Sequence, residues 1–167
     1  MSRAFVKEDS DAPPPPPLER PISGAPNRVT VRGAQLIEDE ILALEAAIVA
    51  AREDTEIESL RRDLRYWAAR RATAQIIPAN RDPTAVGFGT RVTIRRGGSL
   101  SEIDIVGEDE ADPAEGRIAW TSPLARALEE AEAGETVELE AGGATEPIEV
   151  VSVSAMSGEE NTGESGP

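Results

Sequence analysis

The chain has 167 residues, of which 29% are charged, and its formal net charge is -15 at pH 7. Binding to nucleic-acid phosphates draws its affinity from Lys and Arg, so this charge argues against stable DNA binding and favours a locally basic partner. The sequence contains no Cys and no His, which excludes disulfides, thiolate metal sites and the commonest general base. Asp and Glu are therefore the candidate catalytic or metal-binding groups, and the length leaves little room for a large catalytic cleft.

Both ends of the chain have compositions typical of disorder. Residues 1–28 are polar and include five consecutive prolines at positions 13–17, which favour polyproline II. We expect a disordered tail there, acting as a spacer or as a ligand of a proline-recognising domain. Residues 155–167 predict a second, acidic disordered tail. The first nine residues lack a signal-peptide core, and no run approaches the roughly 18 apolar residues of a membrane helix, so a cytoplasmic protein without membrane contact is expected.

Residues 29–78 are predicted to form an antiparallel helical hairpin. Apolar residues recur at helical spacing in two series, and each series lies on one face of a helix. The first series is Ile37, Ile41, Leu44 and Ile48, and the second is Ile57, Leu60, Leu64, Trp67 and Ala74. Because residues 53–55 leave room only for a tight reversal, the two faces can be buried only against each other. At ~1.5 Å per residue, the first arm would be roughly 33 Å long.

Four carboxylates lie at the predicted hairpin loop, on Glu53, Asp54, Glu56 and Glu58. Thr55 and Glu58 have the spacing of a capping box that would start the second helix. Mg²⁺ prefers oxygen ligands and needs only one or two carboxylates from a protein. The loop is therefore either a solvated turn or a metal-assisting tip, with Asp54 and Glu56 as the better ligand candidates.

The second arm carries five arginines beside two aromatic residues. They are Arg61, Arg62, Arg65, Arg70 and Arg71, next to Tyr66 and Trp67. Basic residues between aromatic ones can indicate contact with nucleic acid, but Arg stems also cover helix seams. Since Trp67 is in register with the apolar series, packing is the favoured interpretation.

After a linker at residues 79–86, the pattern changes to the period of two that is typical of strands. Strands are predicted at residues 91–95, 102–105, 117–120, 135–140 and 147–153. Gly97 and Gly98 predict a hairpin turn between the first two. Residues 87–154 thus predict a small, mostly antiparallel sheet, and the whole chain is α+β.

Two further features precede the fourth of these strands. Ser122 as N-cap and Pro123 as first helical residue predict a short helix, and Trp120 just before it should be half-buried. Acidic residues occupy the turn after the second strand, where Glu108, Asp109, Glu110 and Asp112 lack the spacing of a calcium loop and are expected to be solvated.

This order of elements resembles the bacterial Gre transcript cleavage factors. The resemblance lies in the turn Gly107-Glu108-Asp109-Glu110, in the helix Ser122-Pro123-Leu124-Ala125-Arg126-Ala127-Leu128 and in the strand beginning Glu135-Thr136. It extends from Val29 to about Val153. It implies an N-terminal coiled coil and a C-terminal domain similar to the FKBP prolyl isomerases.

The resemblance also implies a partner and two sites. Gre factors bind bacterial RNA polymerase, and the implied docking residues are Thr121, Ser122 and Pro123, with Thr121 replacing an acidic residue of some relatives. The implied role of the tip is to help hold a Mg²⁺ ion shared with the polymerase active site, where the 3′ end of backtracked RNA is cut. The tip sequence departs from the usual Gre pattern, and both arms are shorter than is typical.

Four functions remain open from the sequence. The chain is expected to be a monomeric transcription elongation regulator with no catalysis of its own, acting in the secondary channel of RNA polymerase and stimulating cleavage of backtracked RNA. Alternatively, it is a cleavage-inactive channel binder that modulates or inhibits transcription. An FKBP-like prolyl isomerase and an interaction module for another basic partner are the remaining alternatives.

Overall fold

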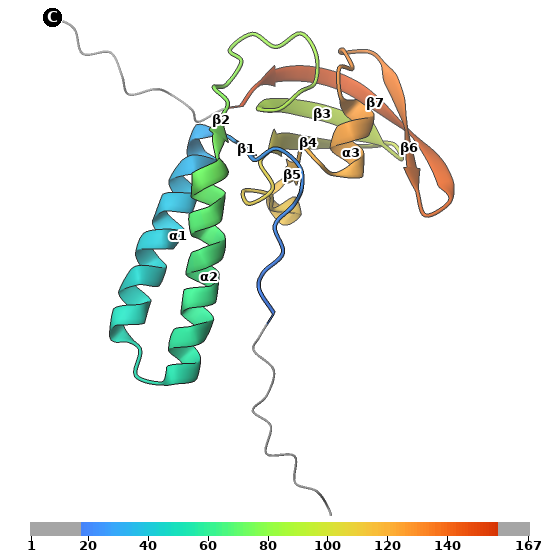
Figure 1. Ribbon diagram of the computed structural model, residues 1–167. Helices are drawn as coiled ribbons and strands as arrows, with labels where there is room; N and C mark the ends of the chain where they lie inside the picture. The colour runs from blue at the N-terminus through green and yellow to red at the C-terminus, as the bar shows by residue number, and fades with distance from the viewer. Residues whose placement is uncertain (1–17, 157–167) are drawn as a thin grey trace, which may run out of the picture.

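The computed structural model describes residues 18–156, so residues 1–17 and 157–167, which are most of the two predicted tails, lie outside the described residues. Figure 1 shows two parts: a helical hairpin, and a curved sheet domain from which the hairpin projects. The hairpin consists of α1 (Val31–Ala50) and α2 (Asp54–Thr73). The predicted α+β fold, a helical hairpin followed by a mostly antiparallel sheet, is confirmed.

The hairpin is held by the apolar faces that the sequence predicts. Ile37, Ile41 and Trp67 are buried between the helices, and Leu44 and Leu64 pack against them. Each helix has 20 residues and is therefore roughly 30 Å long. The burial decreases toward the loop, so the packing that holds the two helices together is concentrated at the base of the hairpin.

The predicted capping box of α2 is wrong. The helix begins at Asp54, after the N-cap Glu53, whose side chain makes no capping hydrogen bond. Thr55 is thus already inside the helix, and Glu58 instead forms an ion pair of 2.9 Å with Arg61. Asp54 and Glu56 lie in the first turn, where negative charge is favoured by the helix dipole. The helix therefore starts two residues earlier than the box predicts.

A short parallel pair of strands closes the base of the hairpin. In this pair β1 (Arg28–Val29) lies beside β2 (Gln75–Ile76), with Arg28 opposite Gln75 and Val29 opposite Ile76. The chain therefore enters and leaves the hairpin side by side. At the start of α1, the hydroxyl of the N-cap Thr30 accepts a hydrogen bond of 2.8 Å from the amide of Gly33.

The sheet domain contains five strands in the order β5-β4-β3-β7-β6. Their bounds are β3 (Thr90–Arg96), β4 (Ser99–Val106), β5 (Arg117–Ala119), β6 (Thr136–Ala141) and β7 (Ala144–Ala155). Only β5 pairs parallel, with β4. Gly97 and Gly98 have φ values of 53° and 82°, which a two-residue turn between β3 and β4 requires and which glycine adopts without strain.

The core of the domain lies between the sheet and α3 (Pro123–Leu128). Ala125 and Leu128 of α3 pack with Val92, Ile105 and Val150 of the strands. The short helix η1 (Pro113–Glu115) precedes β5. Among the helices of residues 18–156, none combines the length and apolar content that crossing a membrane demands.

Candidate functional site

The hairpin tip, residues 51–58, lies at the end farthest from the sheet domain (Figure 1). Glu53, Asp54, Glu56 and Glu58 are all exposed there. Glu58 pairs with Arg61, whereas Glu53, Asp54 and Glu56 have no ion-pair partner among residues 18–156. No group of three or more acidic side chains in that part of the chain is close enough to hold a metal ion. The tip can therefore offer one or two carboxylates to a metal held elsewhere, but it does not form a complete site.

Residues 121–123, which the sequence predicts as a docking site and which we name the docking loop, connect β5 to the first residue of α3. Ser122 is the N-cap of α3, and its hydroxyl accepts a hydrogen bond of 3.2 Å from the amide of Ala125. Pro123 is exposed and occupies the first helical position. The hydroxyl of Thr121 turns inward and donates a hydrogen bond of 3.0 Å to Oε1 of Glu108. Trp120 packs against the domain core and is half-buried, in agreement with the sequence prediction.

The predicted solvation of the acidic turn after β4 is wrong for Glu108, Asp109 and Glu110, whereas the side chain of Asp112 is 45% exposed and pairs with Arg117 at 3.2 Å. We name Glu108, Asp109 and Glu110 the acidic clamp, because these three residues hold the hairpin to the sheet domain. The side chain of Asp109 is 5% exposed and that of Glu110 is 1% exposed. A buried carboxylate requires a compensating donor or cation, and the hairpin supplies both.

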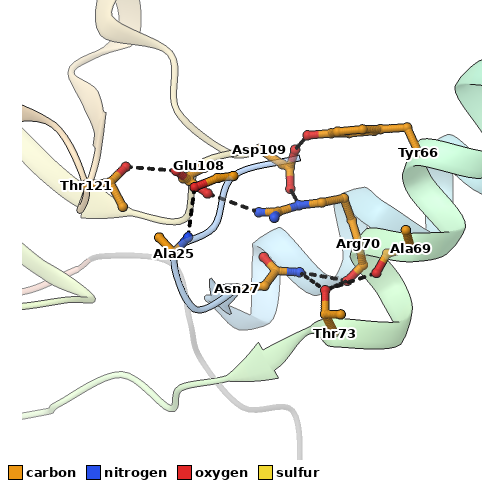
Figure 2. A network of polar contacts seen from close by, with 10 residues as sticks. Ala25, Asn27, Tyr66, Ala69, Arg70, Thr73, Glu108, Asp109 and Thr121 are labelled. Carbon is orange, nitrogen blue, oxygen red and sulfur yellow. Dashed lines mark hydrogen bonds and ion pairs between the residues drawn. The ribbon is translucent and has the colours of Figure 1, made fainter. Parts of the chain in front are cut away.

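Asp109 binds α2 at two positions that are one helical turn apart. Nε of Arg70 donates to Oδ2 of Asp109 at 2.5 Å, and the hydroxyl of Tyr66 donates to Oδ1. Nη2 of Arg70 also lies 3.5 Å from Oε2 of Glu108. Figure 2 shows these contacts continuing to Thr121 in the docking loop. The guanidinium of Arg70 is thus surrounded by two carboxylates from the sheet domain, although it belongs to the hairpin.

Glu110 binds the beginning of α1. Its Oε2 accepts a hydrogen bond of 2.5 Å from the hydroxyl of Thr30, and its Oε1 lies 3.7 Å from Nη1 of Arg32. A Cβ atom at Gly33 would lie 2.9 Å from Oε2 of Glu110, so glycine permits the carboxylate to approach the helix. The positive end of the α1 dipole also favours this buried negative charge.

Residues 18–27, which we name the N-terminal strap, lie along α2, although the sequence predicted disorder for residues 1–28. The guanidinium of Arg20 lies 3.8 Å from the ring centroid of Tyr66, and Glu19 pairs with Arg65 at 2.5 Å. Nδ2 of Asn27 donates to the carbonyl oxygen of Arg70 at 2.7 Å. These contacts explain why the strap is ordered: its charged and amide groups find partners on the last three turns of α2.

Burial raises the pKa of Tyr66 to about 12, with a further contribution from its hydrogen bond to Asp109. The neutral phenol is therefore the stable form, and it donates to Asp109 throughout the physiological pH range. The ring of Tyr66 also makes an edge-to-face contact with Trp67, with centroids 5.3 Å apart. Tyr66 thus connects the strap, the hairpin core and the acidic clamp.

The sequence interpretation missed Arg70 as a structural residue of the interface, although it favoured packing for the arginines of this arm. One signal was present, because Arg70 lies three residues after Trp67 and four before Ala74, on the buried face of the helix. Arg61, Arg65 and Arg71 are exposed. A charged residue on an apolar stripe indicates a buried partner, and the acidic turn was the available one.

These features define a class of protein in which a two-helix hairpin, carrying exposed carboxylates at its free end, is fixed by buried ion pairs to a small sheet domain. Comparison with known proteins identifies the family. Residues 81–155 match the family model for the C-terminal domain of the transcription elongation factors GreA and GreB. The chain belongs to the GreA/GreB family.

Two relatives agree with this assignment in sequence. The chain is 35% identical over 150 residues to the transcription elongation factor GreA of Methylococcus capsulatus, which covers 75% of this chain and 95% of that protein. It is 40% identical over 95 residues to GreB of Neisseria meningitidis, covering 55% of this chain and 58% of that protein. Among solved structures, GreA factor homolog 1 of Thermus thermophilus is 15% identical with a TM-score of 0.37, covering 75% and 97% of the two chains.

Proposed function

We propose that this chain is an RNA polymerase-binding transcription elongation factor that acts through the secondary channel of the polymerase. The observation that carries the proposal is a hairpin that projects from a sheet domain (Figure 1). The hairpin is roughly 30 Å long, and the carboxylates at its free end are exposed. The membership of the GreA/GreB family supports the same partner. The chain has no catalysis of its own in this proposal.

The sheet domain is the proposed anchor on the polymerase, through residues 121–123. Pro123 is exposed and Ser122 holds the start of α3, so the loop has a fixed backbone on which a partner surface can dock. Its local charge is neutral because Thr121 stands where an acidic residue occurs in some relatives. The nearby carboxylate of Glu108 partly restores the negative character, since its side chain is 23% exposed.

The hairpin tip is proposed to stimulate cleavage of backtracked RNA. Asp54 and Glu56 are exposed at the start of α2 and can each contribute an oxygen ligand to a Mg²⁺ ion that the polymerase holds. When bound, such an ion would activate a water molecule for attack on the RNA phosphodiester. The tip residues of this chain would only hold and orient the ion, near the RNA 3′ end.

The prolyl isomerase alternative is not favoured. The concave surface beside Phe88 and Trp120 encloses about 10 Å³, which is room for about one water molecule rather than a proline ring. The guanidinium of Arg28 lies 4.5 Å from the Trp120 ring centroid and covers this surface. A peptide isomerisation assay would detect the activity directly.

The experiment combines binding with cleavage. Purified core polymerase is first tested for binding to the chain, and a stalled, backtracked complex is then tested for RNA cleavage with and without it. The critical variant is Asp54→Asn combined with Glu56→Gln, and the control is Glu40→Gln combined with Glu45→Gln, which removes two exposed charges from α1. We expect the wild type and the control to stimulate RNA cleavage. The tip variant should bind the polymerase equally well but stimulate cleavage at least tenfold less.

Each outcome has a distinct meaning. Absence of polymerase binding contradicts the proposed function altogether and favours an interaction module for another basic partner. Binding without any stimulation by the wild type assigns the chain to the cleavage-inactive channel binders. Equal stimulation by wild type and tip variant agrees with the polymerase as partner but contradicts a metal-binding role for Asp54 and Glu56.

A further inference from the structure

The contacts between the docking loop and the hairpin form a continuous path. The hydroxyl of Thr121 donates to Oε1 of Glu108 at 3.0 Å, and Oε2 of Glu108 lies 3.5 Å from Nη2 of Arg70. Arg70 in turn donates to Asp109, which also binds Tyr66. The path therefore runs from the proposed docking surface through the interface into α2, as Figure 2 shows.

We propose that Thr121, Glu108 and Arg70 are positioning residues that couple the docking loop to the direction of the hairpin. This inference rests on the proposed function for its biological meaning, because it assumes that the docking loop and the tip act on the same partner. The coupling itself is a property of the isolated chain. It is therefore measurable whether or not the polymerase is the partner.

The interface fixes the hairpin at three points. Asp109 holds α2 through Tyr66 and Arg70, and Glu110 holds the start of α1 through Thr30. Three points on two helices determine both the tilt of the hairpin and its rotation about its own axis. Since the side chains of Arg70, Asp109 and Glu110 are at most 5% exposed, water cannot readily replace these contacts, and the orientation is stiff.

Glu108 is the adjustable member of this interface. Its Oε2 is buried without a hydrogen bond among residues 18–156 and makes only the 3.5 Å ion contact with Arg70. The hydroxyl of Thr121 is thus the strong donor that holds the Glu108 side chain in place. Without it, the carboxylate is free to turn toward Arg70 and compete with Asp109 for the same guanidinium, which shifts one of the three fixed points.

The length of the hairpin amplifies such a shift. Because α2 rises ~1.5 Å per residue over its length, a rotation of about 10° at the base would displace the tip by about 5 Å. A displacement of that size exceeds what a metal ligand tolerates. The state of the Thr121 hydroxyl, which lies beside the docking surface, would therefore decide whether the tip carboxylates are correctly placed.

The test measures the direction of the hairpin by electron spin resonance. The chain has no native Cys, so spin labels can be attached at only two engineered sites, Arg52→Cys at the tip and Ser101→Cys on β4, both of which are exposed. Thr121→Val removes the hydroxyl at nearly constant shape, and Arg70→Lys keeps the charge but loses the two-sided guanidinium contact. Thr145→Val, an exposed threonine on β7, is the matched control.

We expect one narrow distance distribution in the labelled parent and in Thr145→Val, and a distribution at least twice as broad or a shifted maximum in Thr121→Val. Arg70→Lys should broaden it further. A Thr121→Val distribution equal to that of the parent overturns the proposal, and this single variant suffices if Arg70→Lys does not fold. A thermal unfolding midpoint close to that of the parent separates the effect from general destabilisation.

Affinity for core polymerase provides a second, separate measurement on unlabelled protein. If positioning is coupled to docking, the Kd of the double variant Thr121→Val with Arg70→Lys should differ at least threefold from the value expected by adding the effects of the two single variants. Additive effects contradict the coupling. Failure of the wild type to bind polymerase contradicts the proposed function instead, while the spin-label result for the isolated chain still stands or falls on its own.

Discussion

The hairpin tip and the acidic clamp are both short acidic segments, yet the structure gives them opposite environments. Glu53, Asp54 and Glu56 at the tip are exposed, whereas the side chains of Asp109 and Glu110 in the clamp are at most 5% exposed. The difference follows from their partners, because the clamp faces Arg70, Tyr66 and Thr30 while the tip faces solvent. Acidic clusters in a sequence are thus assigned a role by the cations and donors that the fold brings to them, and not by their charge alone.

The largest expected effect in this comparison is that of Arg70→Met. The substitution keeps much of the apolar stem but leaves Asp109 as a buried charge without its cation, so unfolding should become easier by about 3–5 kcal/mol. Urea denaturation measures the change. The control is Arg61→Met, which removes an exposed ion pair with Glu58 and should cost at most about 1 kcal/mol. Similar losses for the two variants would mean that the clamp contributes no more than a surface ion pair.

A smaller effect is expected for Gly107→Ala, at the residue that precedes the clamp. A Cβ atom there would lie 2.7 Å from the carbonyl oxygen of Arg28, which belongs to the β1–β2 pair, so either this pair or the turn at Gly107 must shift. We expect a loss of about 1–3 kcal/mol from this overpacking. Gly87→Ala is the control, since its Cβ would have no atom within 4 Å. If Gly107→Ala unfolds at the same denaturant concentration as Gly87→Ala, the two parts of the protein are not closely packed at this point.

The titration of Tyr66 tests the clamp without changing its charge. The chain contains a single tyrosine, so tyrosinate absorbance reports on this residue alone, and its pKa should be about 12 rather than the ordinary 10.0. The folded protein therefore holds this proton more tightly than the unfolded chain does. The stabilisation of the folded state by the protonated phenol is fully present below about pH 10 and is lost as the pH rises through about 12.

Asp109→Asn provides the matched variant for this titration. It removes the negative charge that accepts from the phenol, so the pKa of Tyr66 should fall, while burial of the ring still keeps it above the ordinary value. A pKa near 10 in the wild type would show that the phenol is in contact with water rather than with Asp109.

The smallest effect is expected at the tip. Asp54→Asn combined with Glu56→Gln removes two charges that the α2 dipole favours, at a cost of about 0.3–1 kcal/mol for each. The free energy of unfolding should therefore change far less than in Arg70→Met. A loss of 3 kcal/mol or more would contradict the exposed tip and would place a buried partner beside it.

Much of the fold could be predicted from the sequence, since it is encoded locally. The helical period of Ile37, Ile41 and Trp67 indicates the hairpin, and the two glycines at positions 97 and 98 indicate the turn between β3 and β4. The Ser122 cap of α3 was equally evident. These elements depend on neighbours within a few residues, which a sequence displays directly.

The acidic clamp could not be predicted in the same way because its contacts are distant in sequence. Glu110 binds Thr30 across 80 positions and Asp109 binds Arg70 across 39. Local composition describes such a turn as polar, and only the docking of the hairpin onto the domain shows that it is buried. The error in the capping box of α2 has the opposite origin, since a shift of two residues in the helix start places Thr55 inside the helix.

The parallel pairing of β1 with β2 has an evolutionary consequence. The clamp holds the hairpin near Thr30 and between Tyr66 and Arg70, in the half of each helix that is nearer to this pair. Equal insertions or deletions in the outer halves would lengthen or shorten the hairpin, by about 10 Å for every seven residues in each arm, while leaving its attachment untouched. The length of the hairpin and its attachment to the sheet domain can therefore change independently in evolution.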